Sequence, residues 1–434
     1  MSNKGPVQGT KGVSGAPSLR RVVSRWQIVG LSLNDVIGSG VYLLPAAAAA
    51  MLGSASVWAV LVAGLAVALL TLCFAEASSH FDQPGGAYLY ARSAFGKLVG
   101  FEVGWMTWLA RVSSEASLSV GFAQAVSYVW PAVDGGPPRV LAIALPVVVL
   151  TVLNVIGVRS GVGAAIFLIV TKMIPLLLFV GAGVFFFSIE TLSNQPAGTG
   201  EMGRAALLLL FAYAGFENTP AAAGEHRNPR RDVPIALLIN ITVVTLLYVA
   251  VQAVTLGTLP GAGVSATPLA DAAAAFLGSW AGWLLTIGAA LSILGTNSNT
   301  VLAGPRYLYA LARDGFGPGI LARIHPRFRT PAAAVILQAA IALPLALSGS
   351  FVALAELSVV ARLATYLGTA AAVPVLRRRG DTTRSSFRIP GGPLIPVAAS
   401  LLTIALTASA TMANLIVAAI ALGVGLLLYL VRRR

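Results

Sequence analysis

Three basic residues, Arg111, Lys172 and Arg362, lie inside long hydrophobic runs of the sequence. A charged side chain at the centre of a bilayer costs about 2.5–3.5 kcal/mol even on lenient insertion scales, so it marks function by default. Lys172 lies roughly 12 Å into its run at the rise of an α-helix. Its amine either acts at that depth or reaches back to the membrane surface along its aliphatic stem.

Acidic residues accompany these bases. Glu115 follows Arg111 by four residues, which puts both on one helix face, and Glu356 precedes Arg362 in the same run. Since buried charges are usually paired, we expect an Arg111–Glu115 ion pair and consider pairing of Glu356 with Arg362. The alternative is that Glu115 contacts a cationic substrate.

Two hydrophobic runs are interrupted at mid-membrane depth, by Ile37-Gly38-Ser39-Gly40-Val41 and by Ala212-Tyr213-Ala214-Gly215-Phe216. A break leaves backbone groups without partners, which hydrocarbon does not tolerate unless the break lines a cavity or meets a ligand. We therefore expect a binding site at the breaks, with Glu217 holding the second break by hydrogen bonds. The alternative is that the glycines only allow close helix packing.

The direction of the helices determines which backbone groups each break offers to a ligand. The N–H groups of Ser39, Gly40 and Val41 open the outer half-helix, whose positive end suits a carboxylate. Backbone carbonyls that suit an ammonium group belong to Asp35, Val36, Ile37, Phe211, Ala212 and Ala214. A carboxylate receptor beside an ammonium receptor predicts an α-amino acid as ligand.

The Asp35 side chain precedes the first break directly. It is an intramembrane acid, so it either exchanges protons or meets the substrate amine. The alternative is a buried acid that is hydrogen-bonded to a neighbouring helix.

The elements that must position these residues are membrane helices. The chain has 434 residues, of which 57% are hydrophobic and 10% charged, and a mean hydropathy of +0.84. This is too apolar for a soluble domain. Hydrophobic runs occur near 26–50, 55–79, 97–130, 139–157, 161–188, 203–223, 233–257, 279–305, 332–348, 351–375, 392–410 and 413–431. They predict an all-α membrane protein with twelve transmembrane helices.

Basic residues set the orientation of these helices. Of the 29 Lys and Arg residues, 24 fall on the side of the N-terminus, and only Arg139 and Arg204 fall on the other side. This distribution predicts that both termini are cytoplasmic, in the cell (inner) membrane, and it explains the net charge of +14 without a nucleic-acid partner. Residues 1–25 predict a disordered cytoplasmic tail, and we expect His226 to be a solvated loop residue.

The two interrupted runs resemble each other. GVYLLPAAA begins at Gly40 and GFENTPAAA begins at Gly215, an offset of 175 residues. Five predicted helices separate them, so the second copy would be inverted in the membrane, as in many secondary transporters. The predicted divisions are repeats at 26–190 and 203–375, followed by two helices and a short tail at 390–434.

Other classes of protein lack support in the sequence. The single cysteine, Cys73, excludes an intramolecular disulfide, and three histidines in separate segments argue against a metal site. No nucleophile with a base stands out in the helices, so we expect neither an enzyme nor a cofactor. A receptor that binds an amino acid without moving it is the remaining alternative. Nothing in the sequence indicates an oligomeric state.

Four strings resemble the amino acid, polyamine and organocation (APC) superfamily of permeases. They are IGSGVYLLP at 37–45, FAEASSHFDQPGGAYLYARSAFG at 74–96, FAYAGFENTPAAAGEHRNPRRDVP at 211–234 and AGPRYLYALARDG at 303–315. The resemblance implies a leucine-transporter-like fold with inverted five-helix repeats, broken helices 1 and 6, and alternating access around a midplane amino acid site.

Site residues follow from the same resemblance. It implies that Gly38, Ser39 and Gly40 bind the carboxylate and that Phe211 is an aromatic gate at the second break. Lys172 resembles the lysine that proton-coupled relatives carry where sodium-coupled relatives bind sodium. We therefore expect coupling to a proton.

The substrate side chain is less defined. Glu115 aligns with a pocket residue of arginine and agmatine exchangers, but Asn299 stands where those exchangers use a tryptophan, and Ala214 replaces a bulkier gate residue. Without the aromatic face, a guanidinium is held less well. We expect symport or exchange of a neutral amino acid, with a cationic amino acid or a polyamine as the alternative.

Overall fold

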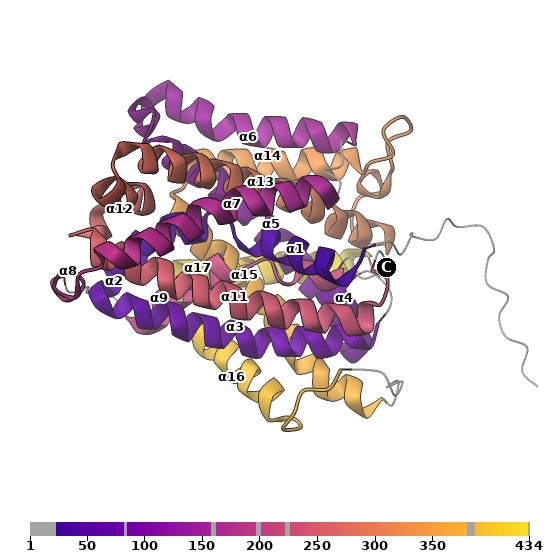
Figure 1. Ribbon diagram of the computed structural model, residues 1–434. Coiled ribbons are helices and arrows are strands. Elements are labelled where there is room, and N and C mark those ends of the chain that lie inside the picture. Colours follow the sequence, from indigo (N-terminus) through magenta and orange to yellow (C-terminus); the bar gives the residue numbers. More distant parts are fainter. Residues whose placement is uncertain are drawn as a thin grey trace, which may run out of the picture.

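The computed structural model describes residues 23–81, 85–157, 162–196, 201–221, 226–379 and 387–432, and these residues are helical throughout their regular structure (Figure 1). The α-helices are α1 (Arg25–Val36), α2 (Gly40–Leu52), α3 (Ser56–Ser79), α4 (Gly86–Phe95), α5 (Lys97–Val126), α6 (Gly136–Ile156), α7 (Val162–Gly183), α8 (Ile189–Ser193), α9 (Met202–Tyr213), α10 (Asn218–Ala221), α11 (Pro229–Thr258), α12 (Pro268–Leu277), α13 (Ser279–Arg313), α14 (Ala332–Ser348), α15 (Phe351–Arg378), α16 (Leu394–Ala408) and α17 (Met412–Arg432). Short 3₁₀ helices are η1 (Gly53–Ala55), η2 (Pro131–Asp134), η3 (Val184–Phe186), η5 (Ala262–Val264) and η6 (Gly319–Ala322).

Within the described ranges, seven helical segments are long and apolar enough to cross a membrane: α2 and α3 together, α6, α7, α11, α13, α15 and α17. Apolar side chains are exposed on the outer helices, among them Leu141 on α6, Ile174 on α7 and Leu427 on α17. Such a surface suits lipid rather than water. The chain is an integral membrane protein.

Most predicted hydrophobic runs coincide with these helices, but three helices were not predicted. α4 and α12 have ten residues each and α8 has five, too short to give a membrane-length run. α13 also continues past Pro305 to Arg313, where the run was predicted to end at 305. A proline removes one hydrogen bond without always ending a helix.

Both predicted interruptions are present. α1 ends at Val36 and α2 begins at Gly40, whereas α9 ends at Tyr213 and α10 begins at Asn218. The two breaks touch: a Cβ on Gly40 would lie 2.4 Å from the Cα of Ala212, and one on Gly215 would lie 2.5 Å from the Asp35 carbonyl oxygen. Gly215 also has φ +127°, a conformation that other residues rarely adopt. Glycine is therefore required where the two breaks meet.

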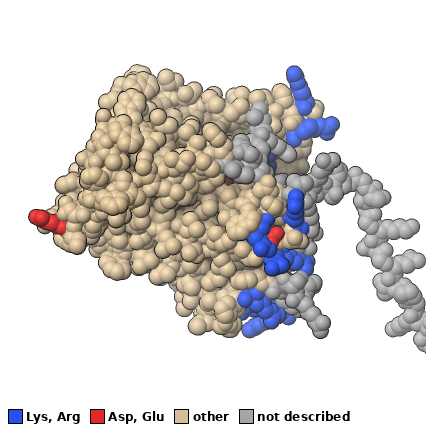
Figure 2. Space-filling model, in the orientation of Figure 1, with Lys and Arg blue, Asp and Glu red and all other residues tan. Residues whose placement is uncertain are grey.

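Basic side chains gather at one end of the molecule in Figure 2. In Figure 1 the same end holds the start of α1 and the end of α17. The one-sided charge distribution expected from the sequence is thus visible on this face. Residues 1–22 of the predicted tail and residues 433–434 lie outside the described residues.

The prediction that His226 is solvated was wrong. His226 is 3% exposed and forms an isolated parallel bridge with Val23, whose carbonyl also accepts from the Arg227 N–H at 3.1 Å. Burial lowers the pKa of His226 to about 4, so the ring is neutral at pH 7. An ion pair of 2.8 Å between Arg25 and Asp232 joins the starts of α1 and α11 at the same end.

Close contact between the breaks makes Gly40 sensitive to substitution. Gly40→Ala is expected to lower the free energy of unfolding by about 1–3 kcal/mol because the new methyl group overlaps the α9 backbone. Gly30→Ala, in α1, is the matched control, since no atom lies within 4 Å of a Cβ there. Thermal unfolding of both purified variants measures the difference, and equal stability of the two would contradict the contact between the breaks.

Candidate functional site

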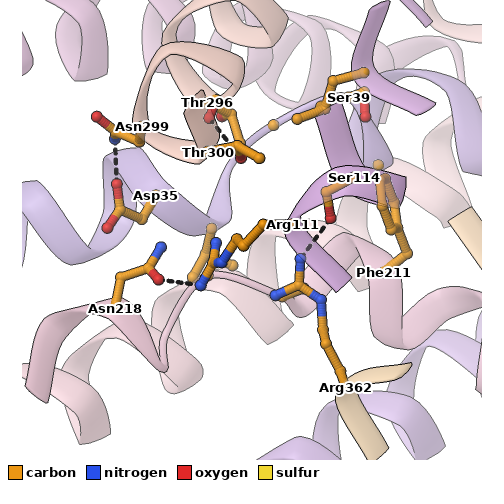
Figure 3. A pocket seen from close by; sticks show the side chains of 16 residues that line it. Asp35, Ser39, Arg111, Ser114, Phe211, Asn218, Thr296, Asn299, Thr300 and Arg362 are labelled. Atoms are coloured by element: carbon orange, nitrogen blue, oxygen red, sulfur yellow. Dashed lines mark hydrogen bonds between the residues drawn. The ribbon is translucent and has the colours of Figure 1, made fainter. Parts of the chain in front are cut away.

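A cavity lies where the two breaks meet (Figure 3). Its lining comes from both breaks and from α5, α13 and α15. The lining residues are Asp35, Val36, Gly38, Ser39, Gly40, Arg111, Ser114, Leu118, Phe211, Ala214, Gly215, Asn218, Thr296, Asn299, Thr300 and Arg362. Of the predicted site residues, Ile37, Val41, Ala212, Glu115 and Lys172 are not in this lining.

Backbone donors at the first break are free. The N–H groups of Ser39, Gly40 and Val41 donate to no acceptor among the described residues, and the Ser39 hydroxyl is also without a partner although Ser39 is only 1% exposed. These donors stand at the positive end of α2 and, for Ser39 and Gly40, on the cavity wall. The arrangement suits a bound anion such as a carboxylate.

Several carbonyl groups at the breaks that were expected to be free for a ligand already accept hydrogen bonds from side chains. The Lys172 amine is fully buried and donates to the carbonyls of Ile37 at 2.6 Å and Asn34 at 3.0 Å. The Ser292 hydroxyl also donates to Ile37, at 2.9 Å. Lys172 therefore binds the end of α1 and does not reach back to the membrane surface.

A tyrosine holds further carbonyls. The Tyr248 hydroxyl, on α11, lies 3.2 Å from the Val36 carbonyl and 3.1 Å from the Ala212 carbonyl, so it joins both breaks. Phe211 lines the cavity, and its ring meets Phe351 edge-on at 5.9 Å between centroids.

Asp35 lies on one wall of the cavity and accepts a hydrogen bond from the Asn299 side chain of α13. No basic side chain described in the structure lies within ion-pair distance of Asp35. Figure 3 shows Asp35 and Asn299 together, away from Ser114 and Arg362. Its carboxylate is the acidic group of the lining, and it is placed to receive an ammonium group.

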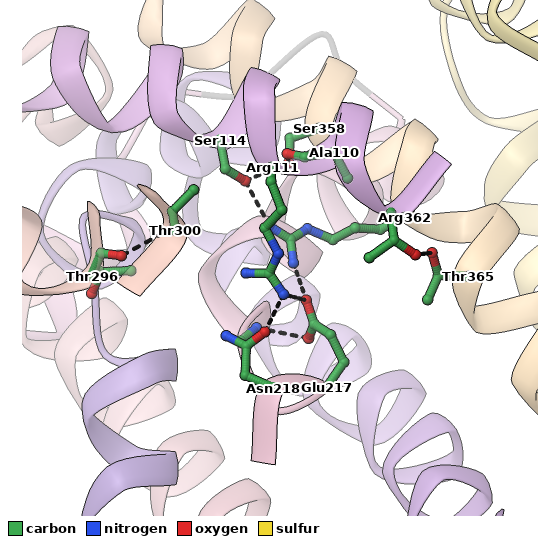
Figure 4. A network of polar contacts seen from close by, with 12 residues as sticks. Ala110, Arg111, Ser114, Glu217, Asn218, Thr296, Thr300, Ser358, Arg362 and Thr365 are labelled. Carbon is green, nitrogen blue, oxygen red and sulfur yellow. Dashed lines mark hydrogen bonds and ion pairs between the residues drawn. The ribbon is translucent and has the colours of Figure 1, made fainter. Parts of the chain in front are cut away.

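A charge network beside the cavity contains other pairs than those predicted from the sequence (Figure 4). Arg111 pairs with Glu217 at 3.3 Å and also donates to Asn218, whereas Arg362 pairs with the same Glu217 oxygen and donates to Ser114 at 2.6 Å. The second Glu217 oxygen accepts from the Gly215 N–H at 2.9 Å. The prediction that Glu217 holds the second break is therefore confirmed.

The expected Arg111–Glu115 pair does not form. Glu115 is fully buried and accepts from the Gln338 amide of α14 at 2.8 Å. Glu356 is likewise not paired with Arg362, since it lies 3.4 Å from Arg204 and accepts from Asn414. Both predictions rested on spacing within one helix, but the partners of these side chains lie on other helices or, for Glu217, in the loop between α9 and α10.

Several lining residues were not among the predicted site residues: Ser114, Leu118, Asn218, Thr296 and Thr300. Polar residues inside three hydrophobic runs were the available signal. Within the described residues, no group of three or more His, Cys, Asp or Glu side chains is placed to hold a metal ion.

Comparisons with known proteins show which proteins this chain is similar to. A family model described as amino acid permease matches residues 23–429. A methylthioribose transporter of Bacillus subtilis (strain 168) is 28% identical over 92% of this chain and 90% of its own length. From the same organism, a branched-chain amino acid permease is 27% identical over 97% and 95% of the two chains, and a serine/threonine exchanger is 29% identical over 85% and 86%.

Glu217 and Glu115 provide a matched test of the charge network, since both are buried glutamates. Glu217→Gln should lower the free energy of unfolding by about 3–5 kcal/mol because it leaves two buried arginines without a counter-charge. Glu115→Gln should change it far less, because its partner is a neutral amide. Thermal unfolding in detergent compares the two, and equal losses would contradict the pairing described here.

Proposed function

The chain belongs to the amino acid permease family, and from this premise we propose that it is a secondary active transporter that moves an amino acid across the cell (inner) membrane by alternating access. The observation that carries the proposal is a cavity lined by residues of both helix breaks. Free N–H groups at the first break and the Asp35 carboxylate in the same cavity match the two charges of an α-amino acid.

The proposed architecture is leucine-transporter-like, with twelve membrane helices. In it, α1 with α2 and α9 with α10 are the broken helices 1 and 6 of inverted repeats at 26–190 and 203–375, and α16 and α17 follow. Contact between the two breaks supports this assignment. The shared end of α1 and α17, together with the basic side chains there, supports cytoplasmic termini.

The lining argues against a cationic substrate side chain. Arg111 and Arg362 face the space beside Ser114 and would repel a second positive charge. Glu115, the acid considered for such a substrate, lies against Gln338. Neutral amino acids, which the sequence favours, and acidic ones are compatible with this lining, whereas arginine and polyamines are not.

Coupling to a proton is proposed through Lys172. When protonated, its amine makes charge-assisted hydrogen bonds to the last carbonyls of α1, and these bonds tie α7 to the first break. When it loses the proton, the charge that strengthens this contact is lost, and α1 is freer to move relative to α7. The proton thus biases the element that carries the carboxylate site.

Proteoliposomes test the transport function directly. Uptake of a labelled amino acid should require the protein, saturate, and rise with an inward proton gradient but not with a sodium gradient. Binding without uptake would instead identify an amino acid receptor. Uptake of methylthioribose but of no amino acid would show that the proposed substrate class is wrong.

Lys172→Ala should abolish the stimulation by a proton gradient while measurable binding remains, because the carboxylate site lies in the backbone of the first break. Lys97→Ala is the control, since Lys97 is exposed at the start of α5. Proton-stimulated uptake that is equal in the two variants would reject the role of Lys172.

A further inference from the structure

Two guanidinium groups share one carboxylate at the cavity. Arg111 and Arg362 are 2% and 5% exposed, and both pair with the same oxygen of Glu217. The three side chains together carry one positive charge that no carboxylate balances within the network. A buried charge without a counter-charge is unfavourable, so this wall of the cavity favours an anion.

No other described acid forms an ion pair with these two arginines. Among the described side chains, Glu115 binds Gln338 and Glu356 is near Arg204, so neither pairs with these arginines. Asp35 lines the same cavity and accepts a hydrogen bond from Asn299. It makes no ion pair with Arg111 or Arg362, although the positive charge of Arg111 acts on its carboxylate.

Both arginines also have donors without acceptors. The Nε atoms of Arg111 and Arg362 are buried and form no hydrogen bond among the described residues. Buried donors normally have acceptors. Because these two Nε atoms belong to residues that line the cavity, the lack of an acceptor points to a ligand.

We propose that the cavity takes an acidic amino acid, whose side-chain carboxylate binds between Arg111 and Arg362. This inference rests on the proposed transport function and refines its substrate, in place of the neutral amino acid favoured by the sequence. The α-carboxylate accepts hydrogen bonds from the N–H groups of Ser39 and Gly40, and the α-ammonium group pairs with the Asp35 carboxylate. The side chain then extends toward α5 and α15, where the free arginine donors lie.

Charge balance supports this substrate. With Lys172 protonated, the groups at the breaks and the cavity wall sum to one positive charge: Arg111, Arg362 and Lys172 against Asp35 and Glu217. An acidic amino acid carries one negative charge at neutral pH, so it and one proton on Lys172 make the loaded site neutral. A neutral amino acid would leave the positive charge uncompensated.

The test compares acids with their own amides, which have nearly the same shape. Purified wild-type protein should bind glutamate or aspartate at least about tenfold more tightly than glutamine or asparagine, because two charged donors face the side chain. Arg362→Gln should reduce the preference for the acid over its amide by about tenfold or more, because the lost charge acts on the acid alone. Arg362→Lys, which keeps the charge but loses the planar fork, should give an intermediate loss.

Arg204→Gln is the matched control, because Arg204 is half-exposed, lies near Glu356 and does not line the cavity. It should retain the wild-type preference for acids. Equal binding of acids and amides by the wild-type protein, or stronger binding of leucine, would overturn the acidic substrate. If the protein still takes up an amino acid in that case, the proposed transport function is unaffected. If the folded protein binds and takes up no amino acid at all, the proposed function itself fails.

Discussion

Backbone polar groups at two breaks in membrane helices need partners, and this requirement shapes the centre of the molecule. Hydrocarbon supplies no hydrogen bonds, so each freed carbonyl or N–H must be met by protein or by ligand. Lys172 and Ser292 meet the end of α1, Tyr248 joins the two breaks, and Glu217 binds the N–H of Gly215. What these side chains leave unmet, at the start of α2, faces the cavity. The binding capacity of the site thus comes from backbone donors at the first break that the described residues leave without an acceptor.

The same residues link the breaks to the surrounding helices. Glu217 connects the loop between α9 and α10 to Arg111 on α5 and Arg362 on α15, and Lys172 connects α1 to α7. A shift of either break must therefore change the partners of a buried charge. Since such charges are costly to leave alone, a substrate or a proton that supplies or removes one charge biases the position of the breaks. This is a physical route from binding to conformational change.

Sequence patterns predicted much of this fold but fewer of its contacts. The hydrophobic runs anticipated most long helices, and the two glycine-containing interruptions anticipated both breaks, because the 20-residue scale of a bilayer and the conformational demands of glycine are local properties. Partner choice between side chains is not local. Arg111 and Glu115 share a helix face, yet the long arginine reaches Glu217 while Glu115 turns to Gln338 of α14. The prediction for His226 failed for the same reason, because His226 pairs with Val23, which is distant in sequence.

The central claim is that an amino acid is held by both of its charged groups where the breaks meet. Thermal stabilisation of the purified protein measures this most directly, because a ligand that binds the folded state more tightly stabilises it more at the same concentration. The amino acid that stabilises most would be compared with its amine lacking the α-carboxylate and with its N-acetylated form. We predict stabilisation by the parent compound and none by either analogue at the same concentration. Equal stabilisation by the amine that lacks the α-carboxylate would contradict the assignment of the first break as the carboxylate site.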